Sequence, residues 1–228
     1  MTMPRTTVTE TSAEARARLS LGISGAAIYE MVIRELGKRN AFHGAIADVG
    51  CGAGHFLAYT RGKFDRYIGV DVVRYETFPP EADFRQVDLD SGRIDLDSGS
   101  VDVVAALETI EHLENPRAFV RELVRIARPG GWVAVTTPNQ LSLLSLLNLL
   151  VRKRFVAFQD VDYPAHLTAL LEVDLRRIAG ECGLREVGIE YTCQARIPMT
   201  WKHYPQMLAR RFPQALSDNM MMIGRKTQ

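Results

Sequence analysis

A repeated order of short apolar runs and helical stretches most constrains the fold of this chain. One apolar run, 45–49, ends in a cluster of glycines, a second, 67–71, ends in an acid, and a helical stretch, 55–63, lies between them. This order and length are typical of a crossover unit with two parallel strands. Three further runs and one amphipathic helix repeat the pattern downstream: 84–87, 101–106, 132–136 and 116–127. The sequence predicts an α/β domain with a doubly wound sheet and helices on both faces.

The C-terminal third departs from this alternation. A strand is expected at 185–191 and another at 219–223, and the excursion 198–212 between them contains no helix long enough for a crossover. The two strands are therefore expected to form an antiparallel hairpin at one edge of the sheet. We expect a single domain over 1–228, with a frayed tail and two insertions on the substrate side: 1–12, 140–165 and 193–214.

Charge and cysteine content narrow the class of protein. The 28 Lys and Arg residues nearly balance the 27 Asp and Glu residues, so no nucleic-acid partner is expected from charge. The three cysteines are odd in number and form no C-x-x-C pair, which favours a reducing, cytoplasmic location. No export signal and no apolar run of membrane-spanning length is visible.

A glycine loop follows the first predicted strand. Gly50, Gly52 and Gly54 stand at a spacing of two between a strand and a helix, where backbone can approach a ligand at the positive end of the helix. The dinucleotide fingerprint G-x-G-x-x-G/A fails because its last position is His55. Asp48, at the start of the loop, places negative charge beside the bound group, which suits a cationic ligand better than a pyrophosphate.

Two further acids follow the next strands. Asp71 lies 21 residues beyond Gly50, where a carboxylate can accept hydrogen bonds from both ribose hydroxyls, and Asp88 follows the next strand, within reach of an adenine amino group. Each acid alone is compatible with a tight turn or a solvated side chain. Their order at successive strand ends favours a nucleoside site.

This constellation resembles the class I S-adenosylmethionine-dependent methyltransferases, from about residue 25 to the C-terminus. The resemblance implies that Asp48 and the three loop glycines hold the methionine part of S-adenosylmethionine, that Asp71 holds the ribose, and that Asp88 and Leu89 meet the adenine. Further marks of the family are Pro-Gly-Gly at 129–131, Thr-Pro-Asn at 137–139 and Met-Ile-Gly-Arg-Lys at 222–226. The family also implies a seven-stranded sheet of order 3-2-1-4-5-7-6 with strand 7 antiparallel.

The segment 107–113 contains Glu108, Glu111 and His112 as an E-x-x-E-H motif. It is similar to a segment of ubiquinone-biosynthesis O-methyltransferases, small-RNA 3′-terminal 2′-O-methyltransferases and methyltransferases of polysaccharide clusters. We therefore expect a methyltransferase that acts on an oxygen of a small molecule, a glycan or a lipid-linked precursor. One alternative is an RNA ribose 2′-O-methyltransferase, which would need more positive charge. Another is a non-catalytic cofactor-binding scaffold.

The same motif supplies the candidate catalytic and metal residues. Glu111, His112 and His166 are the candidates for proton removal from the acceptor, and Glu108 is expected over the cofactor. Positions i, i+3 and i+4 bring Glu108, Glu111 and His112 to one face of a helical turn, and His166 lies in a loop that can fold over them. These four residues predict a divalent-metal site, for magnesium or manganese. Alternatively, Glu111 and His112 only tie the loop to neighbouring backbone.

The leucine-rich segment 141–151 is the most apolar part of the chain. If it is helical, its polar groups form one narrow stripe: Ser142, Ser145, Asn148 and Arg152. Three interpretations are open: core packing, a lid that lines an apolar acceptor pocket, or, over 141–154, peripheral contact with an anionic membrane. The expected opposite wall of the pocket carries Trp201, His203, Tyr204 and Phe212.

Overall fold

The computed structural model describes residues 12–20 and 22–227. The predicted frayed tail lies outside these residues, except for Ser12, where the first helix begins. The helices are α1 (Ser12–Ser20), α2 (Ala26–Lys38), α3 (Leu57–Thr60), the 3-10 turn η1 (Ile110–His112), α4 (Pro116–Ile126), α5 (Leu143–Arg152), α6 (Glu172–Glu181) and α7 (Gln206–Arg211). The strands are β1 (Ala45–Val49), β2 (Arg66–Asp71), β3 (Asp83–Gln86), β4 (Val101–Ala106), β5 (Ala127–Pro138), β6 (Leu184–Tyr191) and β7 (Asn219–Lys226).

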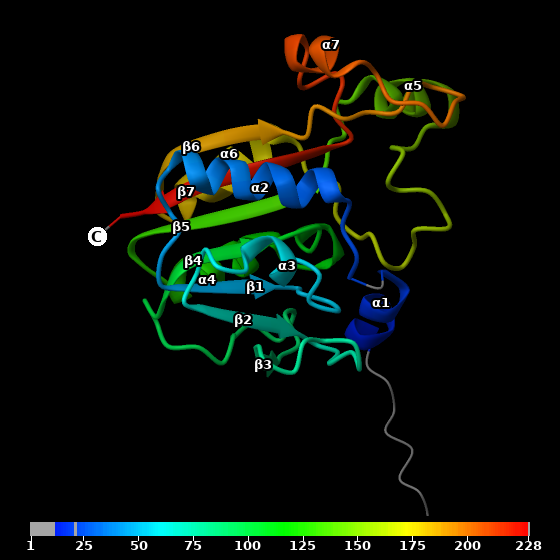
Figure 1. Cartoon of the computed structure of the whole chain (residues 1–228). Coiled ribbons are helices and arrows are strands. Elements are labelled where there is room, and N and C mark those ends of the chain that lie inside the picture. Colours follow the sequence, from blue (N-terminus) through cyan, green and yellow to red (C-terminus); the bar gives the residue numbers. More distant parts are fainter. Residues whose placement is uncertain (1–11, 21, 228) are drawn as a thin grey trace, which may run out of the picture.

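The seven strands form one sheet of order β3-β2-β1-β4-β5-β7-β6 (Figure 1). The pairs among the first five strands are parallel, and β7 runs antiparallel to both β5 and β6. The predicted strand order and the predicted antiparallel edge are both confirmed. The edge hairpin forms because the chain between β6 and β7 returns without a crossover helix.

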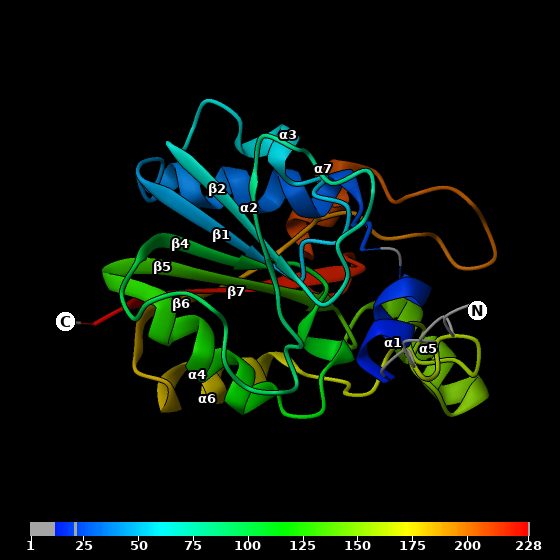
Figure 2. The ribbon, with the colours of Figure 1, turned by 90° about the horizontal axis from the view of Figure 1, so that it is seen from below.

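Alternate strand positions face two separate cores. On one face, Val104 and Val133 pack with Leu123 of α4 and Ile178 of α6. On the other face, strand residues such as Val103 pack with α2 and with the segment around α3. Figure 2 shows α2 and α3 on one side of the sheet and α4 and α6 on the other. The period of two along each strand thus produces the predicted helical layers on both faces.

Two predicted boundaries are wrong. The helix expected at 55–63 is only the four residues of α3, because Gly54 and Gly62 on either side of it adopt φ of +78° and +73°. The strand expected at 132–136 is longer: β5 begins at Ala127, directly after α4, and ends at Pro138, while the helix expected at 116–127 agrees with α4 to within one residue. The pairing of β4 with β5 then shifts its register between Val101 and Val103.

The carboxyl ends of the central strands define the functional edge. The glycine loop follows β1, Asp71 ends β2, Asp88 follows β3 and Glu108 follows β4. The strand order reverses between β1 and β4, and ligands of open α/β sheets bind in the crevice at this kind of switch point. The described helices include none with the length and hydrophobicity that a bilayer span requires.

Candidate active site

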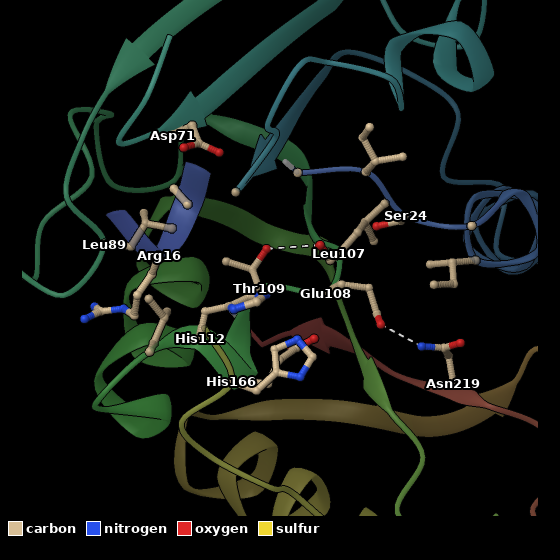
Figure 3. Close-up of a pocket in the computed structure, with 18 of the residues that line it drawn as sticks. Arg16, Ser24, Asp71, Leu89, Leu107, Glu108, Thr109, His112, His166 and Asn219 are labelled. Carbon is tan, nitrogen blue, oxygen red and sulfur yellow. Dashed lines mark hydrogen bonds between the residues drawn. The ribbon is translucent and has the colours of Figure 1, made fainter. Parts of the chain in front are cut away.

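A cavity of about 460 Å³ opens at this edge of the sheet (Figure 3). Its walls come from the loops after the four central strands, from the N-terminal segment 13–28 and from the 192–219 region. The predicted site residues that line it are Gly50, Asp71, Asp88, Leu89, Glu108, Glu111, His112 and His166. Asp48, Gly52 and Gly54 are not among its lining residues. The strand ends therefore bring most of the predicted residues together around one space.

The glycine loop is held by two close approaches. Gly50 adopts φ +79°, and a Cβ there would lie 2.2 Å from Thr109 Oγ1. Gly52 adopts φ +49°, and its Cβ would lie 2.5 Å from the Cα of Gly22. Any side chain at either position would displace the loop, since these distances are shorter than van der Waals contact. Because Gly52 has no side chain, the backbone of the N-terminal segment at Gly22 can pack against the glycine loop.

Asp71 links the glycine loop to the second strand. One carboxylate oxygen accepts a hydrogen bond from the Gly52 N–H at 2.8 Å, and the other accepts one from the Val73 N–H at 3.0 Å. Burial raises the pKa of Asp71, and these backbone donors oppose that rise. The carboxylate is thus fixed in orientation while it lines the cavity, as a partner for ribose hydroxyls must be.

Asp48 lies beneath the loop and is almost completely buried. It accepts a hydrogen bond from the Tyr67 hydroxyl. Burial raises the pKa of Asp48 to about 7, the hydrogen bond from Tyr67 opposes this rise, and the charge of Asp71 adds to it. Asp48 therefore lies beneath the loop and outside the cavity wall.

Glu108 stands at the opposite wall, directly after β4 (Figure 3). Its Oε1 accepts a hydrogen bond from Thr136 Oγ1 at 2.9 Å, and its Oε2 accepts one from Asn219 Nδ2 at 2.6 Å. Burial raises the pKa of Glu108 to about 7, although both hydrogen bonds act in the opposite direction. The antiparallel strand β7 supplies Asn219, so the edge hairpin takes part in the site.

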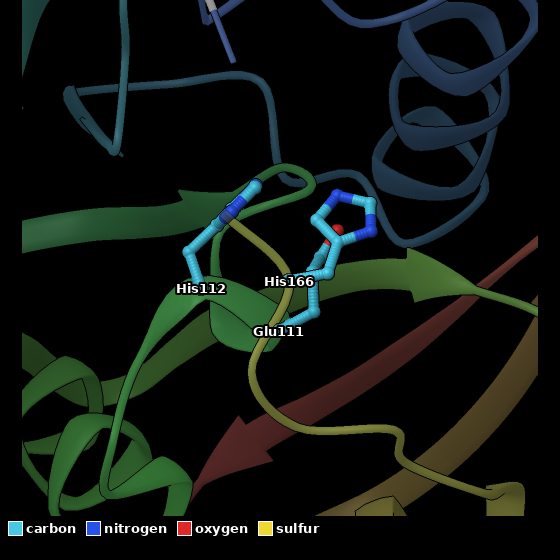
Figure 4. A group of neighbouring side chains, drawn as sticks. All are labelled: Glu111, His112 and His166. Carbon is cyan, nitrogen blue, oxygen red and sulfur yellow. The ribbon is translucent and has the colours of Figure 1, made fainter. Parts of the chain in front are cut away.

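Glu111, His112 and His166 form a compact group (Figure 4). One ligand atom from each lies within 4.8 Å of the others, and the two imidazole rings stand 4.8 Å apart between centroids. The loop of His166 is tethered because Leu167 N–H and Thr168 N–H both donate to the Glu111 carbonyl oxygen, at 2.8 and 3.0 Å. The predicted fold-back of this loop is confirmed.

The predicted helical turn through Glu108 is wrong. Glu108 adopts φ +51°, outside the right-handed helical region, and only Ile110–His112 form a 3-10 turn. Glu108 is therefore not in the Glu111, His112 and His166 group, and its carboxylate oxygens bind Thr136 and Asn219 instead.

Burial controls the protonation of Glu111 and His112. The Glu111 side chain is fully buried, and this burial, together with the charge of Glu108, raises its pKa well above the usual range. Glu111 Oε2 accepts a hydrogen bond from Thr137 Oγ1 at 3.2 Å, whereas Oε1 has no hydrogen-bond partner among the described residues. Burial also lowers the pKa of His112 to about 4, so this imidazole is neutral at physiological pH.

A family model described as a methyltransferase domain matches residues 26–187. This match includes the glycine loop, the acid that ends β2 and the E-x-x-E-H motif. The chain belongs to the class I S-adenosylmethionine-dependent methyltransferases. This family uses S-adenosylmethionine as its cofactor, so the cavity is the candidate site for it.

Individual methyltransferases are similar over part of their length. A probable S-adenosylmethionine-dependent methyltransferase of Mycolicibacterium smegmatis is 33% identical over 117 residues, which are 50% of this chain and 45% of that protein. A ubiquinone biosynthesis O-methyltransferase of Paracidovorax citrulli is 27% identical over 105 residues, 42% of this chain and 44% of that one. These alignments span less than half the length of either relative.

A solved methyltransferase structure shares the fold over most of the chain. The S-adenosylmethionine-dependent methyltransferase of Archaeoglobus fulgidus superposes with a TM-score of 0.62 at 19% identity, over 87% of this chain and 94% of that one. The seven-stranded methyltransferase architecture is thus shared at low sequence identity.

The acceptor side of this methyltransferase differs from the predicted walls. His203 lines the cavity, but Tyr204 does not, and Trp201 and Phe212 are exposed. The leucine-rich helix α5 contributes no residue to the lining. Most of its large apolar side chains are exposed and none is fully buried in the core, so the core interpretation is wrong.

The N-terminal segment supplies lining residues that the sequence did not reveal. Arg16 of α1 lines the cavity and pairs with Asp90, and the Tyr75 hydroxyl donates to the Ala17 carbonyl oxygen at 2.9 Å. Ser24 also lines the cavity (Figure 3). The sequence of this segment contains no chemical motif that would mark these residues as part of the site.

Proposed function

We propose that this methyltransferase transfers its methyl group to a hydroxyl oxygen of a small-molecule, glycan or lipid-linked acceptor, at a divalent metal held by Glu111, His112 and His166. The relative from Paracidovorax citrulli is named an O-methyltransferase, which supports oxygen as the acceptor atom. S-adenosylmethionine supplies an electrophilic methyl group, so the protein has to align the acceptor and accept its proton.

The unpartnered oxygen of Glu111 carries the metal proposal. Among the described residues, it is the sole buried side-chain nitrogen or oxygen that lacks a hydrogen-bond partner. Leaving a buried carboxylate oxygen unsatisfied costs free energy, and natural proteins do so mainly where a ligand completes the site. A cation beside Oε1 would stabilise the charged carboxylate, whose pKa burial otherwise raises.

The two imidazoles support a metal as well. His112 Nδ1 lies 2.8 Å from the carbonyl oxygen of Ala165, and His166 Nδ1 is hydrogen-bonded to the carbonyl oxygen of Ala157. A carbonyl oxygen only accepts, so Nδ1 of each ring carries a proton, and Nε2 is the ring nitrogen left to bind a metal. Backbone carbonyls commonly orient metal-binding histidines in this way.

The ligand atoms of Glu111, His112 and His166 limit which metal ions the site can bind. One carboxylate and two imidazoles are a mixed oxygen and nitrogen set, which suits manganese, iron, zinc or a partly hydrated magnesium rather than calcium. When bound, such a cation would lower the pKa of an acceptor hydroxyl and favour its deprotonation. Without it, the imidazoles of His112 and His166 are the groups available to accept the acceptor proton.

Metal binding can be tested before the acceptor is known. We expect manganese to bind wild-type protein with one-to-one stoichiometry in a calorimetric or electron paramagnetic resonance titration. Glu111→Gln and His166→Ala should each weaken binding by at least about tenfold. His203→Ala is the matched control, because His203 lines the same cavity outside the Glu111, His112 and His166 group. An affinity unchanged in Glu111→Gln and His166→Ala would remove the metal from the proposal.

The acceptor atom requires a transfer assay. Tritiated methyl transfer from S-adenosylmethionine into fractionated lysate should stop after EDTA treatment and return with manganese or magnesium. Mass spectrometry should place the new methyl group on oxygen. A product methylated on nitrogen or carbon would refute the oxygen acceptor, and full activity in EDTA would refute the role of the metal.

A further inference from the structure

Helix α5 turns its apolar side away from the protein. Leu150 and Val151 are 70% and 80% exposed, and the helix also exposes Leu143, Leu146 and Leu147. Positions 143, 146, 147, 150 and 151 follow the i, i+3, i+4, i+7 spacing of a single helical face. An unpartnered apolar face of this kind marks an interaction surface.

The polar stripe of α5 explains this orientation. Ser142 caps the helix by accepting from the Ser145 N–H at 3.2 Å, and Ser145 Oγ accepts from the Val156 N–H at 3.3 Å. Asn148 Nδ2 donates to the Arg154 carbonyl oxygen at 2.7 Å. These bonds fold residues 154–156 back beneath the helix, so Ser142, Ser145 and Asn148 face inward, whereas Arg152 and the exposed leucines face outward.

Two other segments expose large apolar side chains at the same end of the molecule. Trp201 is 84% exposed in the turn before α7, and Met207 of α7 is 86% exposed. Met199 and Phe212 are exposed beside them. Figure 1 shows α5, α7 and the orange turn between β6 and α7 lying beyond the sheet on one side of the molecule. We call residues 143–154 and 196–214 together the apical surface.

The apical surface is also strongly basic. It contains seven Lys and Arg residues and neither Asp nor Glu, whereas the whole chain has a net charge of +1. Within residues 12–20 and 22–227, no ion pair involves these five of its cations: Arg152, Lys153, Lys202, Arg210 and Arg211. Lys202 stacks over Trp201 and Arg211 over Phe212, so cationic groups stand directly beside exposed rings.

We infer that the apical surface docks on an anionic lipid bilayer. Exposed aliphatic and aromatic side chains would enter the acyl boundary, and the neighbouring ammonium and guanidinium groups would contact lipid phosphates. This combination of an apolar helical face, interfacial Trp and unpaired Lys and Arg is the chemistry of peripheral membrane binding.

Three other occupants fit the surface less well. A second copy of the chain would bring two basic surfaces together, and like charges repel. RNA would use the cations but would leave the leucine, valine and methionine side chains without a partner. A protein partner normally fits a continuous apolar core with a polar rim, whereas here the apolar groups protrude from three separate segments.

Vesicle flotation with purified full-length protein tests the inference. We expect flotation with vesicles of equimolar phosphatidylcholine and phosphatidylglycerol, and much less with phosphatidylcholine alone. Leu150→Glu and Met207→Glu should each lower the bound fraction by about tenfold. Arg210→Gln should weaken binding to the anionic vesicles by about fivefold. Val173→Glu, at an exposed apolar position on α6, is the matched control and should float like wild type.

Specific results would overturn the inference. Wild-type protein that does not float with anionic vesicles would refute it. Equal binding to neutral vesicles would refute the role of the basic groups. A wild-type dimer in light scattering that Leu150→Glu converts to a monomer, without flotation, would assign the surface to self-association. Binding of homopolymeric RNA in place of vesicles would assign it to nucleic acid.

Discussion

Replacement of Asp48 by Asn should change how stability depends on pH. Asp48 is almost completely buried beneath the glycine loop, with Tyr67 as its hydrogen-bond donor. Burial raises its pKa from 3.8 to about 7. The folded protein therefore keeps a proton on Asp48 that the unfolded chain has released between these two pH values. Since the folded state binds more protons in this window, the free energy of unfolding falls as pH rises from about 4 to about 7.

The magnitude follows from the size of the shift. A change of about three pKa units corresponds to about 4 kcal/mol when the carboxyl is fully ionised. Between about pH 5 and about pH 8, wild type should lose about 2–3 kcal/mol more stability than Asp48→Asn, because Asn has no proton to release. The variant should be the more stable protein at pH 8.

Urea denaturation of the cofactor-free proteins across this pH range measures the difference. Asp95→Asn, which removes one exposed acid, is the control for net charge and should follow wild type. Tyr67→Phe should act in the opposite direction, because it removes the hydrogen bond that lowers the pKa of Asp48. Parallel stability curves for wild type and Asp48→Asn would refute the burial cost assigned to Asp48.

Two further substitutions distinguish the role of the glycine loop in cofactor binding from the role of the α4 cap in stability. Gly50→Ala places a Cβ 2.2 Å from Thr109 Oγ1 at φ +79°, so we expect S-adenosylhomocysteine affinity to fall by at least about tenfold in calorimetry; unchanged affinity would show that the loop adjusts. Asn115→Ala removes the cap that accepts from the Ala118 N–H at 3.0 Å, and should lower the free energy of unfolding by about 1 kcal/mol in urea without altering cofactor affinity. A loss of affinity there would mean that α4 positions the site.

The positions of the strands could be predicted from the sequence because each strand has its own local pattern of residues. The bounds of β1 and β4 agree with the predicted runs 45–49 and 101–106, since buried parallel strands are continuous apolar stretches between turn residues. The acids at the strand ends were accessible for the same reason. Strand order came from the family resemblance, because long-range pairing leaves no mark on a single segment.

The parts that sequence missed depend on contacts between distant residues. Arg16 reaches the cavity through Asp90, 74 residues away, and Glu108 takes a left-handed conformation that spacing does not reveal. In α5 the polar stripe was visible, but its direction was not. That direction depends on whether Ser145 is hydrogen-bonded to Val156 of the following segment or to water. The spacing of polar and apolar residues along the helix is the same in both cases, so the sequence does not distinguish them.

Calorimetric titration of S-adenosylhomocysteine into wild type and Asp71→Asn tests the central claim most directly. Asp71 lines the cavity, and its two oxygens are oriented by the Gly52 and Val73 N–H groups. Wild type should bind one S-adenosylhomocysteine and no NAD, and Asp71→Asn should lose about 1–3 kcal/mol of binding free energy as its ribose hydrogen bonds weaken. Binding of NAD without a response to S-adenosylhomocysteine, or equal affinity in the two proteins, would contradict this assignment of the site.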